Sequence, residues 1–123
     1  MSHKRKRATI IVQTSEGILL VSHSRHGKPT YMLPGGGVKR GERSIDAGKR
    51  ELHEETGLHT SEIIFLFDFE SKHHNHRVFF AKTYGRLRKR HETTHIRFYN
   101  ESTEDRYQLA WHVRPIIEKY IDM

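Results

Sequence analysis

The pattern of hydrophobic and polar positions divides the chain into short segments of regular structure. β-Branched and aromatic residues gather in short runs bounded by polar or glycine-containing turns, which is typical of strands. Strands are predicted in this way at residues 8–12, 18–21, 31–33, 63–69, 77–84 and 96–99. Near residue 113 the hydrophobic positions take up helical spacing, and Pro115 fits the first turn of a helix. A closing helix packed on the sheet is therefore predicted at residues 113–121.

Another helix is predicted at residues 44–56, between two breaks in the pattern. Before it, Pro34 and the glycines at 35–37 interrupt any regular element and let the backbone turn sharply. Ser44 is the predicted N-cap, with Asp46 near the positive end of the helix dipole. Gly57 is predicted to end the helix, because glycine readily adopts the left-handed conformation found there.

This helix is predicted to carry carboxylates on one face. Glu51 and Glu55 are four residues apart and Glu54 is three residues after Glu51, so helical geometry places the three side chains together. The opposite face carries residues that suit packing against a sheet: Ile45, Ala47, Gly48 and Leu52. Taken alone, three such glutamates are more often a solvated helix face than a binding site.

Three converging carboxylates beside a glycine turn also indicate a site for a hard divalent cation. Mg²⁺ prefers oxygen ligands and keeps several waters, which substrate phosphates can replace. Backbone carbonyls of the glycine turn at residues 35–37 can complete the ligand set. The planar guanidinium of Arg50 can hold a neighbouring carboxylate or a phosphate.

The wider pattern resembles the Nudix box of the Nudix (MutT-like) hydrolases, which reads Gly-x5-Glu-x7-Arg-Glu-aliphatic-x-Glu-Glu-x-Gly-aliphatic. Every fixed position is matched within residues 36–58. The matching residues are Gly36, Glu42, Arg50, Glu51, Leu52, Glu54, Glu55, Gly57 and Leu58. At average residue usage, a chance match is expected on the order of once in 10⁷ chains. The motif is therefore specific for the fold and for pyrophosphate chemistry, but it does not identify the substrate.

The resemblance implies an α/β fold, specifically an α/β/α sandwich with a mixed β-sheet, formed by one domain over residues 1–123. It also implies Mg²⁺-dependent hydrolysis, with Mn²⁺ as an alternative metal. The implied reaction cleaves the pyrophosphate bond of a nucleoside diphosphate linked to another group, as in a nucleoside triphosphate, ADP-ribose or a nucleotide sugar. The implied metal ligands are the carbonyl of Gly36 and the carboxylates of Glu51, Glu54 and Glu55.

The resemblance also implies roles for residues around the metal. Arg50 is implied to orient a helix carboxylate, and either Glu54 or Glu92 is implied to take a proton from the attacking water. The implied substrate-binding residues are Gly35, Gly37 and Arg25. Arg25 lies in a polar loop, where a solvated side chain is the simpler interpretation.

The net charge of the chain widens the range of binding partners that can be expected. The formal net charge is +7 and the isoelectric point is about 9.9, which favours anionic partners such as nucleotides and nucleic acid. Basic residues gather at 4–7 and 86–90, and each cluster is interpreted first as a solvated run. An RNA-directed enzyme or binder that uses these clusters remains an alternative to a hydrolase of small nucleotides. A catalytically silent nucleotide-binding module is another, although the complete box argues against it.

The remaining composition bears on location and assembly. The chain has no cysteine, which excludes disulfides and thiolate sites. It has no run of about 18 apolar residues and no signal-like apolar segment after its first basic residues, so a cytoplasmic location without membrane contact is the default expectation. A homodimer is expected from its frequency among proteins of this family.

Two further features allow two interpretations each. His73, His74 and His76 could suggest Zn²⁺, but one short loop without a second ligand set favours a surface loop at residues 71–76. Trp111 is predicted to anchor the core, with base stacking as the alternative.

Overall fold

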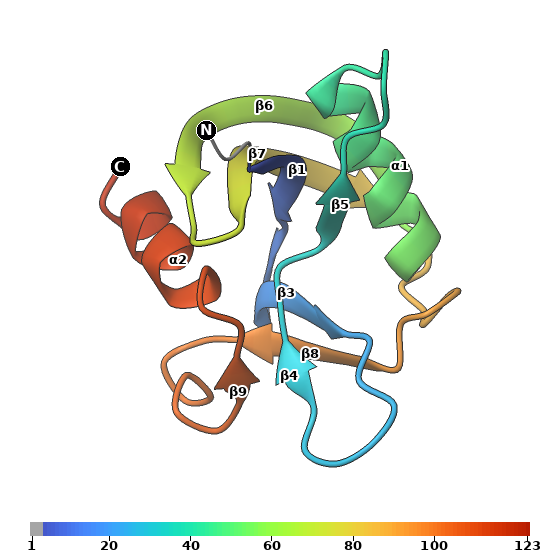
Figure 1. Ribbon diagram of the computed structural model, residues 1–123. Coiled ribbons are helices and arrows are strands. Elements are labelled where there is room, and N and C mark those ends of the chain that lie inside the picture. The colour runs from blue at the N-terminus through green and yellow to red at the C-terminus, as the bar shows by residue number, and fades with distance from the viewer. Residues whose placement is uncertain (1–3) are drawn as a thin grey trace.

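The computed structural model describes residues 4–123 and has a four-stranded mixed sheet at its centre (Figure 1). The order of its strands is β5 (Gly35–Gly37), β1 (Arg5–Ile11), β7 (His74–Tyr84) and β6 (His59–Glu70). β1 runs parallel to β7 and antiparallel to β5, whereas β6 is antiparallel to β7. β1 is therefore an interior strand, paired on both sides.

Shorter strands form two further groups below the central sheet in Figure 1. β2 (Gln13–Thr14), β3 (Gly17–Ser22) and β8 (His95–Tyr99) make an antiparallel sheet in that order. β4 (Thr30–Tyr31) and β9 (Gln108–Leu109) form a parallel pair. Ser22 at the end of β3 pairs with His95 at the start of β8.

The helices α1 (Ser44–Thr56) and α2 (Val113–Ile121) lie on opposite sides of the central sheet (Figure 1). Alternate residues of β1 face the two sides: Ile10 packs in a cluster with α1 residues, and Ile11 packs in a cluster with α2 residues. The predicted α/β/α sandwich with a mixed sheet is confirmed. Within residues 4–123, no helix is long and apolar enough to cross a membrane.

Both helices have the predicted bounds, but the predicted cap of α1 is wrong. The N-cap residue is Arg43, which makes no side-chain hydrogen bond to the helix backbone. Its guanidinium instead binds Asp46, with Nε 2.7 Å from Oδ2. Gly57 ends the helix as predicted, with φ of 76° and its N–H donating to the carbonyl of His53 at 2.8 Å.

Two predictions about exposure are wrong. The predicted loop at residues 71–76 is shorter than expected, because β7 already begins at His74 and includes His76, which is only 1% exposed. The Zn²⁺ alternative gains no support, since no cluster of three potential ligands is found in residues 4–123. Trp111 is 93% exposed and is no core anchor. The core beside α2 is filled from within the helix by Val113, Ile116 and Ile117.

Candidate active site

The glycine strand β5 and the helix α1 meet at close range. Gly35 has φ of 146°, and a Cβ atom there would collide with the carbonyl of Ala8 on β1. A Cβ atom at Gly36 would collide with the side chain of Glu51. Glycine is therefore required at residue 35 if β5 is to pair with β1, whereas a side chain at residue 36 would displace the Glu51 carboxylate. The N–H of Gly35 donates to Oε1 of Glu55 at 2.8 Å, which fixes the helix against the strand.

Arg50 links the carboxylates of the helix to the preceding loop. Its Nε donates to Glu42 at 2.9 Å, and its Nη1 donates to Glu51 at 2.8 Å and to Glu54 at 3.4 Å. Its Nη2 donates to the carbonyl of Gly37 at 3.3 Å. The bond from Arg50, aided by the Lys39 N–H, lowers the pKa of Glu42 to about 2. The planar guanidinium thus holds several acceptors in one arrangement, which an ammonium group could not do.

Glu55 is the most buried of these carboxylates, with an exposed fraction of 4%. Its Oε2 atom is buried and makes no hydrogen bond to the described residues, although Nε2 of His23 lies 2.9 Å away. The carboxylate of Glu55 raises the pKa of His23. Burial raises the pKa of Glu51, and the neighbouring Glu55 charge adds to this effect. A buried carboxylate oxygen is costly unless a cation or donor joins it, and His23 supplies such a donor when its Nε2 carries a proton.

Arg7 and His23 belong to the site, although the sequence did not identify them. Arg7 donates to the carbonyl of Gly35 at 3.2 Å, and burial lowers its pKa while Glu55 and Glu51 oppose that shift. The interpretation of residues 4–7 as a solvated run is therefore wrong for Arg7. Strand alternation could have placed Arg7 on the same face as Thr9, but nothing in the sequence singles out His23.

The other predicted site residues differ in how close they lie to the carboxylate cluster. Glu54 is partly exposed beside Arg50. Glu92 is exposed in the loop after β7, in which the N–H of Arg90 donates to the carbonyl of Glu55 at 3.3 Å, and its charge helps to raise the pKa of His23. Arg25 is exposed on the loop after β3 and makes no hydrogen bond or ion pair to the described residues. The structure therefore brings Glu92 toward the cluster but leaves Arg25 in solvent.

The backbone carbonyls of β5 differ in direction. The N–H of Ile10 donates to Pro34, and the N–H of Val38 donates to Lys6. Because bonded pairs alternate along an antiparallel ladder, the intervening Gly36 directs its carbonyl toward β1. The carbonyls of its two neighbours point away from β1 and accept bonds from arginine side chains.

The donor set fits a magnesium ion better than a metal held wholly by protein. In residues 4–123, no three His, Asp or Glu side chains form a ready-made metal site. Mg²⁺ commonly takes one or two carboxylates and completes its shell with water and phosphate oxygens. The buried carboxylate of Glu55 and the neighbouring carboxylate of Glu51 supply such a pair.

A glycine strand held against a carboxylate-bearing helix, on a mixed sheet between two helices, defines the class of Nudix hydrolases. The NUDIX domain family matches residues 3–119, so the chain belongs to this family.

Similar proteins support this assignment. The chain is 37% identical over 79 residues to an RNA pyrophosphohydrolase from Bartonella clarridgeiae, covering 53% of this chain and 46% of that protein. It is 39% identical over 57 residues to the NAD-capped RNA hydrolase NudC from Vibrio parahaemolyticus, covering 46% and 22%. The chain thus spans less than half the length of these two relatives. A protein described as a nudix hydrolase family member from Chromobacterium violaceum matches the fold with a TM-score of 0.88 and 30% identity, covering 99% of this chain and 79% of that one.

Proposed function

We propose that this protein is a Mg²⁺-dependent pyrophosphohydrolase acting on a nucleoside diphosphate linked to another group. The observation that carries the proposal is the pair of neighbouring carboxylates of Glu51 and Glu55, of which Glu55 is buried with its Oε2 2.9 Å from Nε2 of His23. When bound, Mg²⁺ supplies positive charge to the diphosphate oxygens and lowers the pKa of a coordinated water.

The protein residues bind and orient in this proposal. Glu51 and Glu55 hold the metal, and Arg50 keeps the Glu51 carboxylate in place through its 2.8 Å bond. The Gly35 carbonyl is a better ligand than that of Gly36, because the Gly36 carbonyl is directed into the sheet. Arg7, which binds the Gly35 carbonyl at 3.2 Å, supplies a positive charge that interacts with the carboxylates of Glu55 and Glu51.

Two residues remain candidates for the general base. Glu54 is partly exposed and is held by Arg50 through a 3.4 Å contact. Glu92 is exposed on the loop that approaches His23. Each is accessible to water, which a base for the attacking water requires.

The names of the relatives favour phosphorylated RNA ends as a second candidate substrate beside small nucleotides. Both curated relatives described above are named for action on RNA, and both match only part of their own length. A silent nucleotide-binding module is the remaining alternative. A cytoplasmic location and a homodimer stay predictions.

The proposal is tested by substitution of Glu55 with Gln, assayed with Mg²⁺ across a panel of nucleoside diphosphate derivatives. Gln keeps an acceptor for the Gly35 N–H but removes the charge that binds the metal, so turnover is expected to fall by more than about 100-fold. Glu101→Gln, at an exposed turn, is the matched control and should retain activity.

A second measurement separates metal binding from catalysis. Mg²⁺ should raise the unfolding temperature of the wild-type protein and of Glu101→Gln, but not that of Glu55→Gln. Near-wild-type turnover by Glu55→Gln would refute the metal assignment. Nucleotide binding without turnover by the wild type would favour the silent module.

A further inference from the structure

The loop between β7 and β8, residues 85–94, is fixed to the end of the carboxylate-bearing helix. The backbone N–H of Arg88 donates to the carbonyl of Thr56 at 2.9 Å, and that of Arg90 donates to the carbonyl of Glu55 at 3.3 Å. The Arg90 guanidinium donates to the carbonyl of His53 at 3.2 Å. Arg90 therefore neutralises the negative end of the helix dipole, and the other cations of the loop are not needed for that purpose.

Those other cations line a groove beside the helix end. The groove has a volume of about 390 Å³. We call it the basic groove; its lining includes Arg88, Lys89, Thr94, His95, Ile96 and Arg97. The side chains of Arg88, Lys89 and Arg97 are exposed. No carboxylate of residues 4–123 lies within 4.0 Å of these three charges.

Some cations elsewhere on the described surface have a carboxylate close by. Arg77 lies 3.8 Å from Asp68, Lys82 lies 3.7 Å from Glu62, and Arg114 lies 3.9 Å from Asp105. The basic groove differs from these paired sites because three cations, with no carboxylate of the described residues within 4.0 Å, lie together on one concave surface. A concave surface with three free positive charges suits a single strand with repeated phosphates.

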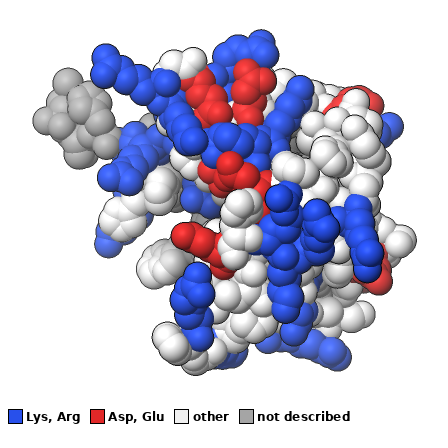
Figure 2. Space-filling view, turned by 90° about the vertical axis from the view of Figure 1, so that its right-hand side faces the viewer, with Lys and Arg blue, Asp and Glu red and all other residues white. Residues whose placement is uncertain are grey.

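The groove and the acidic cluster are connected through the same loop. Glu92 lies between the groove residues Lys89 and Thr94 in the sequence, and the backbone N–H of Arg90 donates to the carbonyl of Glu55 at 3.3 Å. Figure 2 shows acidic side chains on this face with Lys and Arg side chains around them. A substrate whose first phosphates lie at the acidic cluster can therefore continue across the basic groove.

We propose that the basic groove binds the phosphate backbone of an RNA chain whose phosphorylated 5′ end lies at the acidic cluster. This inference rests on the proposed function and names its substrate class. The occupant must be continuous with the nucleoside diphosphate at the acidic cluster, and it must carry further phosphates for the cations of the groove. A polynucleotide meets both conditions. Arg88, Lys89 and Arg97 contact those phosphates, and His95 adds a hydrogen-bonding ring at the groove wall.

The test compares two substrates on one triple variant, Arg88→Gln/Lys89→Gln/Arg97→Gln. One substrate is a 5′-triphosphorylated RNA of about ten nucleotides, and the other is the matching nucleoside triphosphate. The expected result is a loss of about 10- to 100-fold in kcat/KM for RNA, with kcat/KM for the mononucleotide within about twofold of wild type, because only RNA reaches the groove. Arg77→Gln/Lys82→Gln/Arg114→Gln is the matched control, since it removes the same charge from paired sites.

A binding measurement keeps this inference separate from the proposed activity. The affinity for 5′-monophosphorylated RNA of the same sequence is measured by fluorescence anisotropy at several salt concentrations. The triple variant should lower the slope of log affinity against log salt by about 2, as expected when three contacts to a single strand are lost. If the wild-type protein shows no turnover but the triple variant still lowers this slope, the result would support the groove and refute the proposed function.

Three outcomes would overturn the inference. One is unchanged RNA affinity and kcat/KM in the triple variant. Another is an equal loss with RNA and with the mononucleotide, which would place these residues in the reaction site itself. The third is a DNA strand of the same sequence that competes as well as RNA, which would remove the assignment to RNA.

Discussion

At the scale of single residues, the site depends on charges whose partners come from distant parts of the chain. Arg7 comes from the first strand and binds the carbonyl of Gly35, and His23 contacts Glu55 from a loop. Neither residue belongs to the Nudix box. The motif therefore predicts the carboxylates, whereas their neighbours follow from strand order and loop path. No local pattern encodes those contacts.

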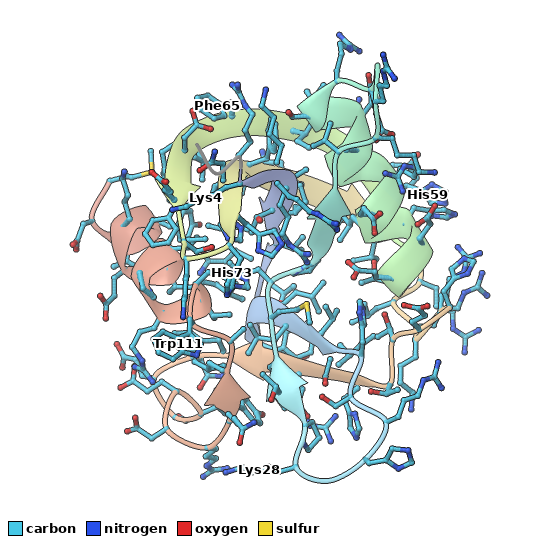
Figure 3. All side chains as sticks on the ribbon, viewed as in Figure 1. Lys4, Lys28, His59, Phe65, His73 and Trp111 are labelled. Atoms are coloured by element: carbon cyan, nitrogen blue, oxygen red, sulfur yellow. The ribbon has the colours of Figure 1, made fainter. Side chains whose placement is uncertain are left out.

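Trp111 provides a prediction at this scale. Figure 3 shows its side chain beside the start of α2, near His73 of the β6–β7 turn. Because Trp111 is 93% exposed, Trp111→Ala should change the free energy of unfolding by less than about 0.5 kcal/mol. Ile116→Ala, at a fully buried position of α2, is the control and should cost about 2–5 kcal/mol. Urea denaturation measures both variants.

The same substitution examines the alternative of base stacking. Trp111 and His112 line a pocket of about 320 Å³ with His74 and Lys72. If a base stacks on the indole, KM for the preferred nucleotide should rise by about tenfold in Trp111→Ala, since stacking contributes about 1–3 kcal/mol per base. An unchanged KM, together with an unchanged stability, would leave Trp111 without a role in either.

At the scale of secondary structure, the sequence predicted elements well where local signals are strong. Both helices have the predicted bounds, because Gly57 and the helical spacing at 113–121 are local signals. The start of β7 was missed because His74 and His76 have no marked strand preference. His76 is stabilised in the strand by bonds between its Nδ1 and Thr9 at 2.8 Å and between its Nε2 and Ser71 at 3.1 Å. The first of these bonds joins residues far apart in sequence.

The end of α1 provides the prediction at this scale. Gly57 has φ of 76°, and an added Cβ atom would lie 3.1 Å from the carbonyl oxygen of Arg86. Gly57→Ala should therefore lower the free energy of unfolding by about 1–2 kcal/mol. Gly37→Ala is the control, since its backbone has no positive φ and its added Cβ would meet nothing within 4 Å. Equal stability losses in the two variants would contradict the assigned cost of the left-handed cap.

At the scale of the whole molecule, an acidic cluster and a group of histidines beside Arg7 form two separate regions. The net charge is +7, yet the acidic cluster lies at the point where β5, α1 and the loops converge. On the α2 side of the sheet, Arg7 lies beside a group of histidines that form no ion pair with a carboxylate of residues 4–123. His76 and His112 stack there with ring centroids 4.6 Å apart, and His74 lies 5.8 Å from His76.

These histidines predict a dependence of stability on pH. Burial, reinforced by His112 and Arg7, lowers the pKa of His76 to about 3, and burial with Arg7 lowers that of His112 to about 4. Because both folded-state pKa values lie below the unfolded value of 6.5, stability is complete above pH 6.5 and is lost as pH falls toward 4. Between pH 6 and 5, the two side chains should remove up to about 2 kcal/mol from the free energy of unfolding.

Denaturant titrations at a series of pH values measure this dependence. His112→Asn should reduce the slope between pH 6 and 5 by about half, since one of the two titrating groups is removed. His26→Asn, at an exposed loop position, is the control. A slope that is the same in wild type and His112→Asn would show that carboxylates, and not these histidines, determine the acid sensitivity.

The close approach of β5 to β1 has a consequence for protein engineering. Glu55 is positioned by the Gly35 N–H, Gly35 lies against the Ala8 carbonyl, and β1 is held in turn by the parallel strand β7. A transplant of residues 36–58 into a foreign scaffold would carry every residue of the motif and none of this support. The smallest portable unit extends from β1 through β7, so the motif identifies the chemistry but is not itself a module.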